Sequence, residues 1–93
     1  MPSADKGEVI LIPVNAGSGP FSGERLITFD TLDGPISGFI RANQVEVRNG
    51  RSFIGALVLD VTSEYISVRL HGSFFTTTGL AHIDKLTPFL RAA

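Results

Sequence analysis

Histidine gives the first candidate for chemistry, because the chain contains only two, His71 and His82. His82 and Asp84 are two residues apart, so on a β-strand their side chains would share one face. That spacing suits a histidine base oriented by a carboxylate, or two ligands of a metal ion. A metal site needs three or four ligands and the sequence marks no third. We therefore expect no metal or cofactor and interpret the pair as a surface hydrogen bond.

The arginines form a second candidate site. Within residues 34–59 the only acidic residue is Glu46, and Arg69 and His71 would share a face of one strand. The planar guanidinium group of arginine suits phosphate oxygens. The alternative is that these residues are solvated and protect strand edges from aggregation, which the formal net charge of −1 favours. The candidate residues for binding a ligand or RNA are Arg41, Arg48, Arg51, Arg69 and His71.

Two further motifs lack the context that chemistry requires. The glycine-rich segment 17–23 has Ser22 where the dinucleotide fingerprint needs its third glycine, and a strand-like segment follows it instead of a helix. Residues 76–78 are three threonines, which are most simply an exposed strand. No hydroxyl side chain stands out as a nucleophile with a base. We therefore predict no catalytic residue and favour a non-enzymatic protein; a small enzyme with a site between subunits is the remaining alternative.

These side chains would be carried by short strands, because glycine and proline interrupt the chain often and β-branched residues fill the intervals. Asn49 and Gly50 lie between alternating segments and predict a two-residue type I′ hairpin. Pro13 has no N–H group, which predicts that the end of the first strand lies at a sheet edge. The expected strands are 8–14, 24–32, 36–42, 44–48, 52–61, 65–70 and 73–78, with residues 1–7 flexible, residues 15–23 a loop, and residues 80–90 either extended or a short helix.

The chain length of 93 residues predicts a single domain spanning residues 1–93. We predict an all-β fold, a small antiparallel barrel or sandwich of about six to eight short strands, with a short C-terminal helix as an option. The absence of cysteine excludes disulfides and thiolate metal sites. A packed core, an oligomer or a bound partner must then stabilise so small a protein.

The composition predicts association of the chain with itself. Apolar residues make up 43% of the sequence and charged residues 18%, against roughly 25% charged residues in an average soluble domain. The segments 8–14 and 53–61 are apolar on both alternating faces, although a small sheet has one core face. We expect the second face to be buried between subunits, and we place Val58 on that face. The predicted partner is a second copy of the chain.

The remaining expectations concern location. The first seven residues lack the apolar run of a secretory signal, and no segment approaches the ~18–20 apolar residues of a membrane-spanning helix. The sequence therefore predicts a cytoplasmic protein without a membrane partner.

Three segments of the sequence resemble the trp RNA-binding attenuation protein (TRAP) family. The first has Asp33, Gly34, Gly38 and Arg41 in a small hairpin. The second has Thr62 and Ser63 before the alternating residues 66–72. The third has Phe75 and Thr78 before Ile83 and Asp84, and the three together cover about half of the chain.

This resemblance implies a ring of β subunits that binds tryptophan between subunits and single-stranded RNA around its rim. Arg69 and His71 would stand where the family has a basic pair before a glycine that contacts RNA, although His71 matches only in part. Thr62 matches a threonine near the amino-acid pocket, whereas Asp60 stands where the family has an amide. A small barrel of the Sm-like or SH3-like type fits the same strand spacing and also binds RNA or peptides. Single-stranded RNA and a small ligand are accordingly the alternative partners.

Overall fold

The computed structural model describes residues 4–19, 21–70, 73–74 and 79–91, and in these it is all-β. Every strand pair is antiparallel, so the predicted all-β antiparallel fold is confirmed. Within the described chain, no helix has the length and apolar character needed to cross a bilayer. The elements are β1 (Val9–Ser18), β2 (Glu24–Thr31), β3 (Gly34–Arg41), the 3₁₀ turn η1 (Ala42–Gln44), β4 (Val45–Arg48), β5 (Arg51–Val61), β6 (Tyr65–Leu70), β7 (Ser73–Phe74), β8 (Leu80–Asp84) and β9 (Leu90–Arg91).

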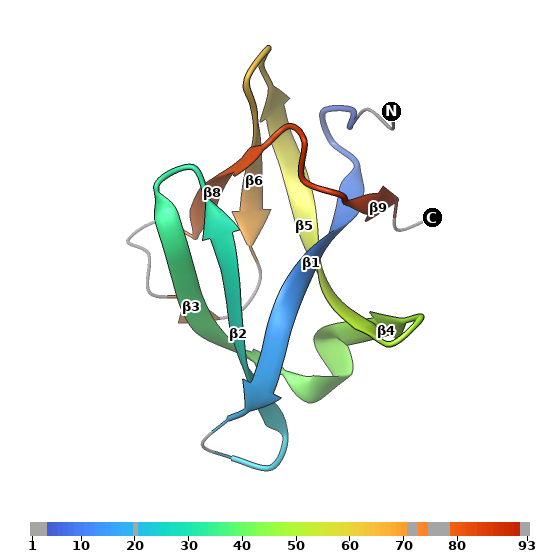
Figure 1. The fold of residues 1–93 in the computed structure, drawn as a ribbon, viewed down its shortest axis with the longest axis vertical. Helices are drawn as coiled ribbons and strands as arrows, with labels where there is room; N and C mark the ends of the chain where they lie inside the picture. The colour runs from blue at the N-terminus through green and yellow to red at the C-terminus, as the bar shows by residue number, and fades with distance from the viewer. Residues whose placement is uncertain (1–3, 20, 71–72, 75–78, 92–93) are drawn as a thin grey trace.

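The sheet curls because β1 belongs to both of its halves. Residues Val9 to Val14 pair with β5, whereas Asn15 to Ser18 pair with β2. The strands follow the order β7-β3-β2-β1-β5-β6-β8, with β4 beside β5 and β9 beside β1. Figure 1 shows β5 crossing β1 near the middle of the molecule, with the β2–β3 hairpin to the left of β1. The result is a partly closed barrel whose concave side holds the core.

Pro13 lies where β1 changes partner along one of its edges. On that edge Leu11 pairs with Leu90 of β9, and Asn15 pairs with Thr28 of β2. Pro13 falls between these two pairs, so its missing N–H group lies where the ladder with β2 ends. The predicted sheet edge is thus a local gap, and β1 itself is an interior strand.

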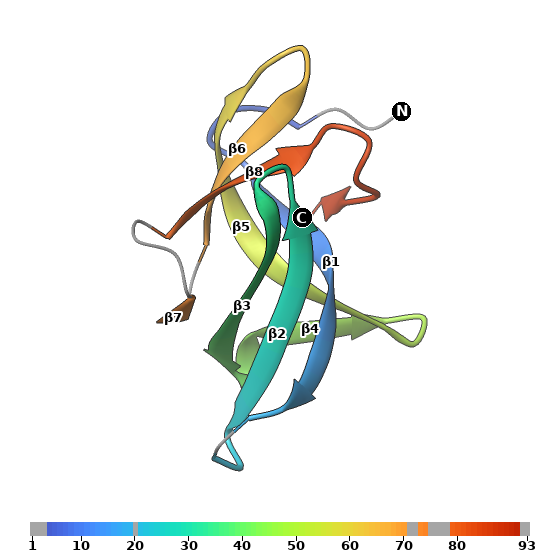
Figure 2. The ribbon, with the colours of Figure 1, turned by 60° about the vertical axis from the view of Figure 1, so that its left-hand side comes forward.

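The barrel is brought together at β8 by a backbone hydrogen bond from the β2–β3 turn. The N–H group of Leu32 donates to the carbonyl oxygen of His82 at 2.9 Å. β8 is also paired along its length with β6. In Figure 2 β8 passes close to the β2–β3 hairpin, with β5 and β6 behind it. A second connection is made by β7, which begins three residues after the end of β6 and pairs with β3 on the other side of the barrel.

The core consists of one set of side chains from each of β1, β2, β3, β5, β6 and β8, together with Ala4 and Phe89 from outside the strands. Val58 is 1% exposed and packs among these residues, which corrects its predicted position between subunits. Its neighbour Leu57 takes the outer face and is half-buried. The register with β6 shifts between Val58 and Asp60, so strict alternation fails there and Val61 packs against the core. Before this shift both alternating faces are apolar, and the pattern alone does not show which one is inside. The largest fully buried side chains are Ile10, Ile12, Ile27, Ile54, Val58, Ile66, Val68 and Ile83.

The Asn49-Gly50 hairpin is confirmed. Asn49 has a φ of 53° and Gly50 a φ of 77°, and positive values at both positions define the type I′ turn. Arg48 and Arg51 close the turn as cross-strand partners.

Two predicted segment boundaries are wrong, and one alternative left open by the sequence is decided. Asn15 to Ser18 were expected in a loop but extend β1, because pairing with β2 supplies hydrogen bonds that outweigh their low strand propensity. Residues 4–7 were expected to be flexible, yet Ala4 is buried in the core and Gly7 donates to the carbonyl of Val58 at 2.8 Å. The optional helix within residues 80–90 is absent: residues 80–84 form β8 and residues 85–87 a turn.

Candidate functional site

The arginines predicted to bind a ligand or RNA are dispersed over the molecule. Arg41 ends β3 and pairs in register with Glu24. Arg48 and Arg51 flank the tip of the β4–β5 hairpin, which projects from the body of the molecule (Figures 1 and 2). Arg69 pairs with Leu57 of β5. Leu57 lies six residues from Arg51 along the same strand, which is roughly 20 Å at the rise of a strand. His71 lies outside the described residues, as do the three threonines at 76–78.

Arg48 and Arg51 differ in their surroundings although they are neighbours. The Nε atom of Arg48 lies 2.6 Å from Glu46 Oε2 in an exposed ion pair. Arg51 forms no ion pair with any described residue, and it lines a groove together with residues of β1 and β2. One arginine is therefore engaged within its own hairpin, whereas the other is available for a ligand.

Arg69 belongs to a row of four side chains that crosses the outer face of the sheet. Val9 pairs with Leu57, Leu57 with Arg69, and Arg69 with Leu80. Val9 and Leu80 are 43% and 38% exposed, and Leu57 is half-buried. We call these four residues the outer row. It spans β1, β5, β6 and β8 and places one cation among three apolar side chains.

Polar groups flank the outer row on the side nearer the β5–β6 turn. Asp60, Ser67 and His82 are cross-strand neighbours there, followed by Tyr65 and Asp84. Asp60 is exposed, and its Oδ1 accepts a hydrogen bond from the N–H group of Val61 at 2.9 Å. The outer row therefore has a cation within it and carboxylates beside it.

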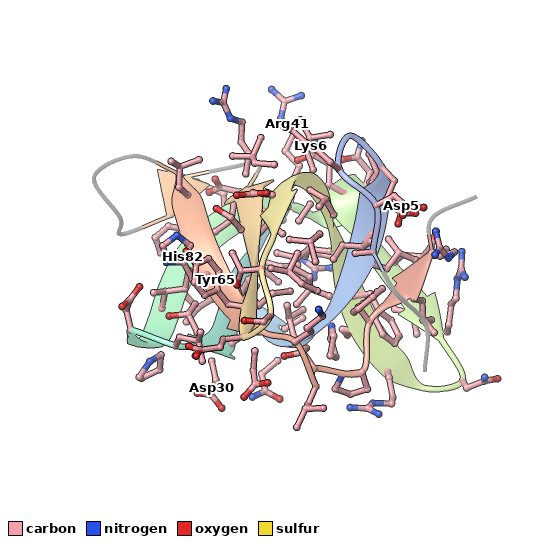
Figure 3. All side chains as sticks on the ribbon, turned by 90° about the horizontal axis from the view of Figure 1, so that it is seen from above. Asp5, Lys6, Asp30, Arg41, Tyr65 and His82 are labelled. Carbon is pink, nitrogen blue, oxygen red and sulfur yellow. The ribbon has the colours of Figure 1, made fainter. Side chains whose placement is uncertain are left out.

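His82 is placed differently from its predicted pairing with Asp84. The two do share the exposed face of β8, but the carboxylate nearest His82 is that of Asp33, with Nδ1 and Oδ2 3.9 Å apart. The imidazole stacks on the ring of Tyr65, with 4.5 Å between ring centroids and 29° between planes. Figure 3 shows Tyr65 and His82 side by side. No group of three metal-ligating side chains occurs among the residues that the structure describes.

Thr62, which resembles a residue of the TRAP amino-acid pocket, is used here to build a turn. Its hydroxyl donates to the carbonyl of Tyr65 at 3.2 Å and accepts from the N–H groups of Glu64 and Tyr65 at 3.2 and 3.0 Å. Asp60, at the departure from that family, is exposed on the outer face. The hydroxyl of Thr62 is therefore committed to the β5–β6 turn.

Sequence reasoning missed residues of both the outer row and the groove beside Arg51. Leu80 of the outer row falls in residues 80–90, which the sequence leaves open between extended chain and helix, and Asn15 of the groove falls in the segment 15–23, which the sequence predicts as a loop. Val9 and Leu57 were both within segments recognised as apolar on two faces, so that pattern was the available signal. Comparison of the chain with protein-family models, with curated proteins and with solved structures finds no match.

Proposed function

We propose that this protein is a non-enzymatic assembly module that associates with a second copy of itself through the outer row. The observation that carries the proposal is that the outer row places Val9, Leu57 and Leu80, with Arg69 between the two leucines, on the outer face. Leu90, also 38% exposed, adds to this apolar surface through its pairing with Leu11. Clustered exposed apolar side chains with a polar border are typical of an interaction surface.

The charges around the outer row favour a second copy as the occupant. In an interface with two-fold symmetry the same surface meets itself, so each charged group faces the other subunit. Arg69 forms no ion pair with a described residue, and Asp60 lies in the adjoining cross-strand row. A two-fold axis between the two rows brings Arg69 of each subunit to the Asp60 carboxylate of the other. The apolar side chains supply the burial and this pair fixes the orientation.

The test compares two exposed valines on strands that pair with β5. Val9→Lys places a charge in the outer row, whereas Val47→Lys places the same charge on β4, where Val47 is 64% exposed. Both side chains are at the surface, so both variants should fold. We expect light scattering to give a wild-type mass that is a multiple of the 9.9 kDa chain. Val9→Lys should shift the mass toward smaller species, and Val47→Lys should leave it unchanged.

Two results would contradict the proposal. One is a wild-type mass near 9.9 kDa at micromolar concentrations. The other is equal dissociation of the two lysine variants with unchanged circular dichroism, because the charge would then act without regard to its position.

A further inference from the structure

A groove with a volume of about 530 Å³ opens where β1 leaves β5 and joins β2. Residues 13–16 of β1, 28–30 of β2 and 50–52 at the start of β5 line it, together with Pro88. Small-molecule and peptide pockets commonly measure ~300–1,000 Å³. The groove combines four segments that are distant in sequence and lies on a different part of β1 from the outer row.

Pro13 explains why this groove is not closed by strand pairing. Gly19 donates to the carbonyl of Glu24, and hydrogen-bonded pairs recur at every second residue of an antiparallel ladder. The series continues to Asn15 with Thr28, where the pairing of β1 and β2 stops. Its next member would be Pro13 with Asp30, but proline has no N–H group to donate. The backbone carbonyl of Asp30 therefore faces the groove without a donor from β1.

Opposite charges line the same groove without being paired. Arg51 and Asp30 are both exposed, and neither forms an ion pair with a described residue. The hydroxyl of Thr28 is already hydrogen-bonded to that of Ser37 at 3.1 Å. A guanidinium group holds a carboxylate through two parallel hydrogen bonds, whereas a free carboxylate accepts from an ammonium group. The two charges therefore suit a ligand with a carboxylate at one end and a cation at the other.

We propose that the groove binds a short extended peptide with free ends. Its C-terminal carboxylate binds Arg51, its ammonium group binds the side chain of Asp30, and a backbone N–H group donates to the Asp30 carbonyl. Such a peptide supplies the donor that Pro13 lacks, in the manner of a strand added to a sheet edge. This proposal does not depend on self-association of the chain.

Nuclear magnetic resonance titration of the full chain with tetra-alanine provides the test. Four forms of the peptide are used: both ends free, the N-terminus acetylated, the C-terminus amidated, and both ends blocked. We expect saturable shifts of the amide signals of Asn15, Asp30 and Ser52 with the free peptide. Amidation should weaken binding about tenfold or more, as the loss of a charge-assisted bidentate contact implies.

Two arginine variants separate the proposed contact from a general charge effect. Arg51→Gln should weaken the free peptide as much as amidation does, and the amidated peptide should bind this variant no more weakly than it binds the wild type. Arg48→Gln is the matched control, since it removes a positive charge across the same hairpin and outside the groove. Asp30→Asn should weaken binding of the free peptide as much as acetylation of the peptide N-terminus does. The acetylated peptide should bind the Asp30→Asn variant no more weakly than it binds the wild type.

Three outcomes would overturn the proposal. The first is no saturable shift at peptide concentrations on the order of 10 mM, where millimolar binding is detectable. The second is shifts centred outside the groove. The third is equal weakening by Arg48→Gln and Arg51→Gln, which would show nonspecific attraction. The amide spectrum of each variant also shows whether it is folded.

Discussion

Truncating two neighbouring residues of β5 tests the assignment of its faces and the assembly proposal together. Val58→Ala removes two carbon atoms from a side chain that is 1% exposed. Leu57→Ala removes three carbon atoms from a half-buried side chain on the outer face. If side-chain size alone determined the cost, Leu57→Ala would be the more damaging change. We expect the opposite order for the isolated subunit.

The expected sizes follow from burial. Each buried CH₂ group contributes about 0.8 kcal/mol, and a core truncation also leaves a cavity, so Val58→Ala should cost about 2–3 kcal/mol. Leu57 loses contacts on one side only and leaves no enclosed cavity, so its truncation should cost about 1 kcal/mol or less. A domain of this length has a total free energy of unfolding on the order of 5–14 kcal/mol. At ~4–8 °C per kcal/mol, Val58→Ala should lower Tm by about 8–24 °C.

The assay is urea denaturation at two protein concentrations, with light scattering of the same samples. At a concentration where the chain is a monomer, only Val58→Ala should lower the midpoint strongly. At a higher concentration the wild type should gain stability by association, and Leu57→Ala should lose that gain while Val58→Ala keeps it. Equal costs for the two variants in the monomer would refute the assignment of Leu57 to the outer face.

Three further predictions concern the turns. Gly50→Val should cost about 1–2 kcal/mol, because Gly50 has a φ of 77° that a β-branched residue resists, whereas an added Cβ atom there meets no heavy atom within 4 Å. An added Cβ atom at Gly17 also has open space and the φ of Gly17 is ordinary, so Gly17→Val should be near neutral in the same denaturation assay. Thr62→Val should cost about 1–2 kcal/mol, because the N–H groups of Glu64 and Tyr65 lose their acceptor; an unchanged midpoint would show that water replaces the hydroxyl. Asp33→Asn should change stability by less than about 0.5 kcal/mol, since its 3.9 Å contact with His82 is exposed; a larger loss would mean that this pair contributes to barrel closure.

The local features of the fold were predictable because they depend on neighbouring residues. The type I′ turn at Asn49-Gly50 follows from two residues that tolerate positive φ. The faces of β6 follow from alternation, since Ile66, Val68 and Leu70 are buried whereas Arg69 is exposed. Strand pairing between distant segments had no comparable signal. Asn15 to Ser18 and Leu80 to Asp84 become strands through partners that lie elsewhere in the chain.

The candidate sites were less predictable because they depend on the curl of the sheet. Arg48 and Arg51 are equivalent in the sequence, and only the bend of β1 toward β2 places Arg51 beside a groove. Val58 and Leu57 have the same apolar character, and only the barrel determines which one faces its interior. Pro13 was recognised as unable to donate to a ladder. The acceptor that an N–H group at this position would have had is the carbonyl of Asp30, and it is known only from the position of β2.

The distribution of exposed apolar side chains separates a specific surface from a generally apolar protein. Seven large apolar side chains are exposed in the described chain. Phe21, Leu32 and Leu86 lie between strands, where single exposed residues are ordinary. Four of them lie on strands. Val47 is the one on β4, and the other three share the outer face of the sheet built on β1, β5, β6, β8 and β9: Val9, Leu80 and Leu90. The outer face of the β2–β3 hairpin carries the hydrogen-bonded pair of Thr28 and Ser37 beside the half-buried pair of Leu26 and Phe39, and it has no apolar strand residue as exposed as Val9 among the described residues. A low charged fraction alone would not gather the exposed strand residues on one part of the sheet, and this gathering is the reason why the proposed association is assigned to the outer row.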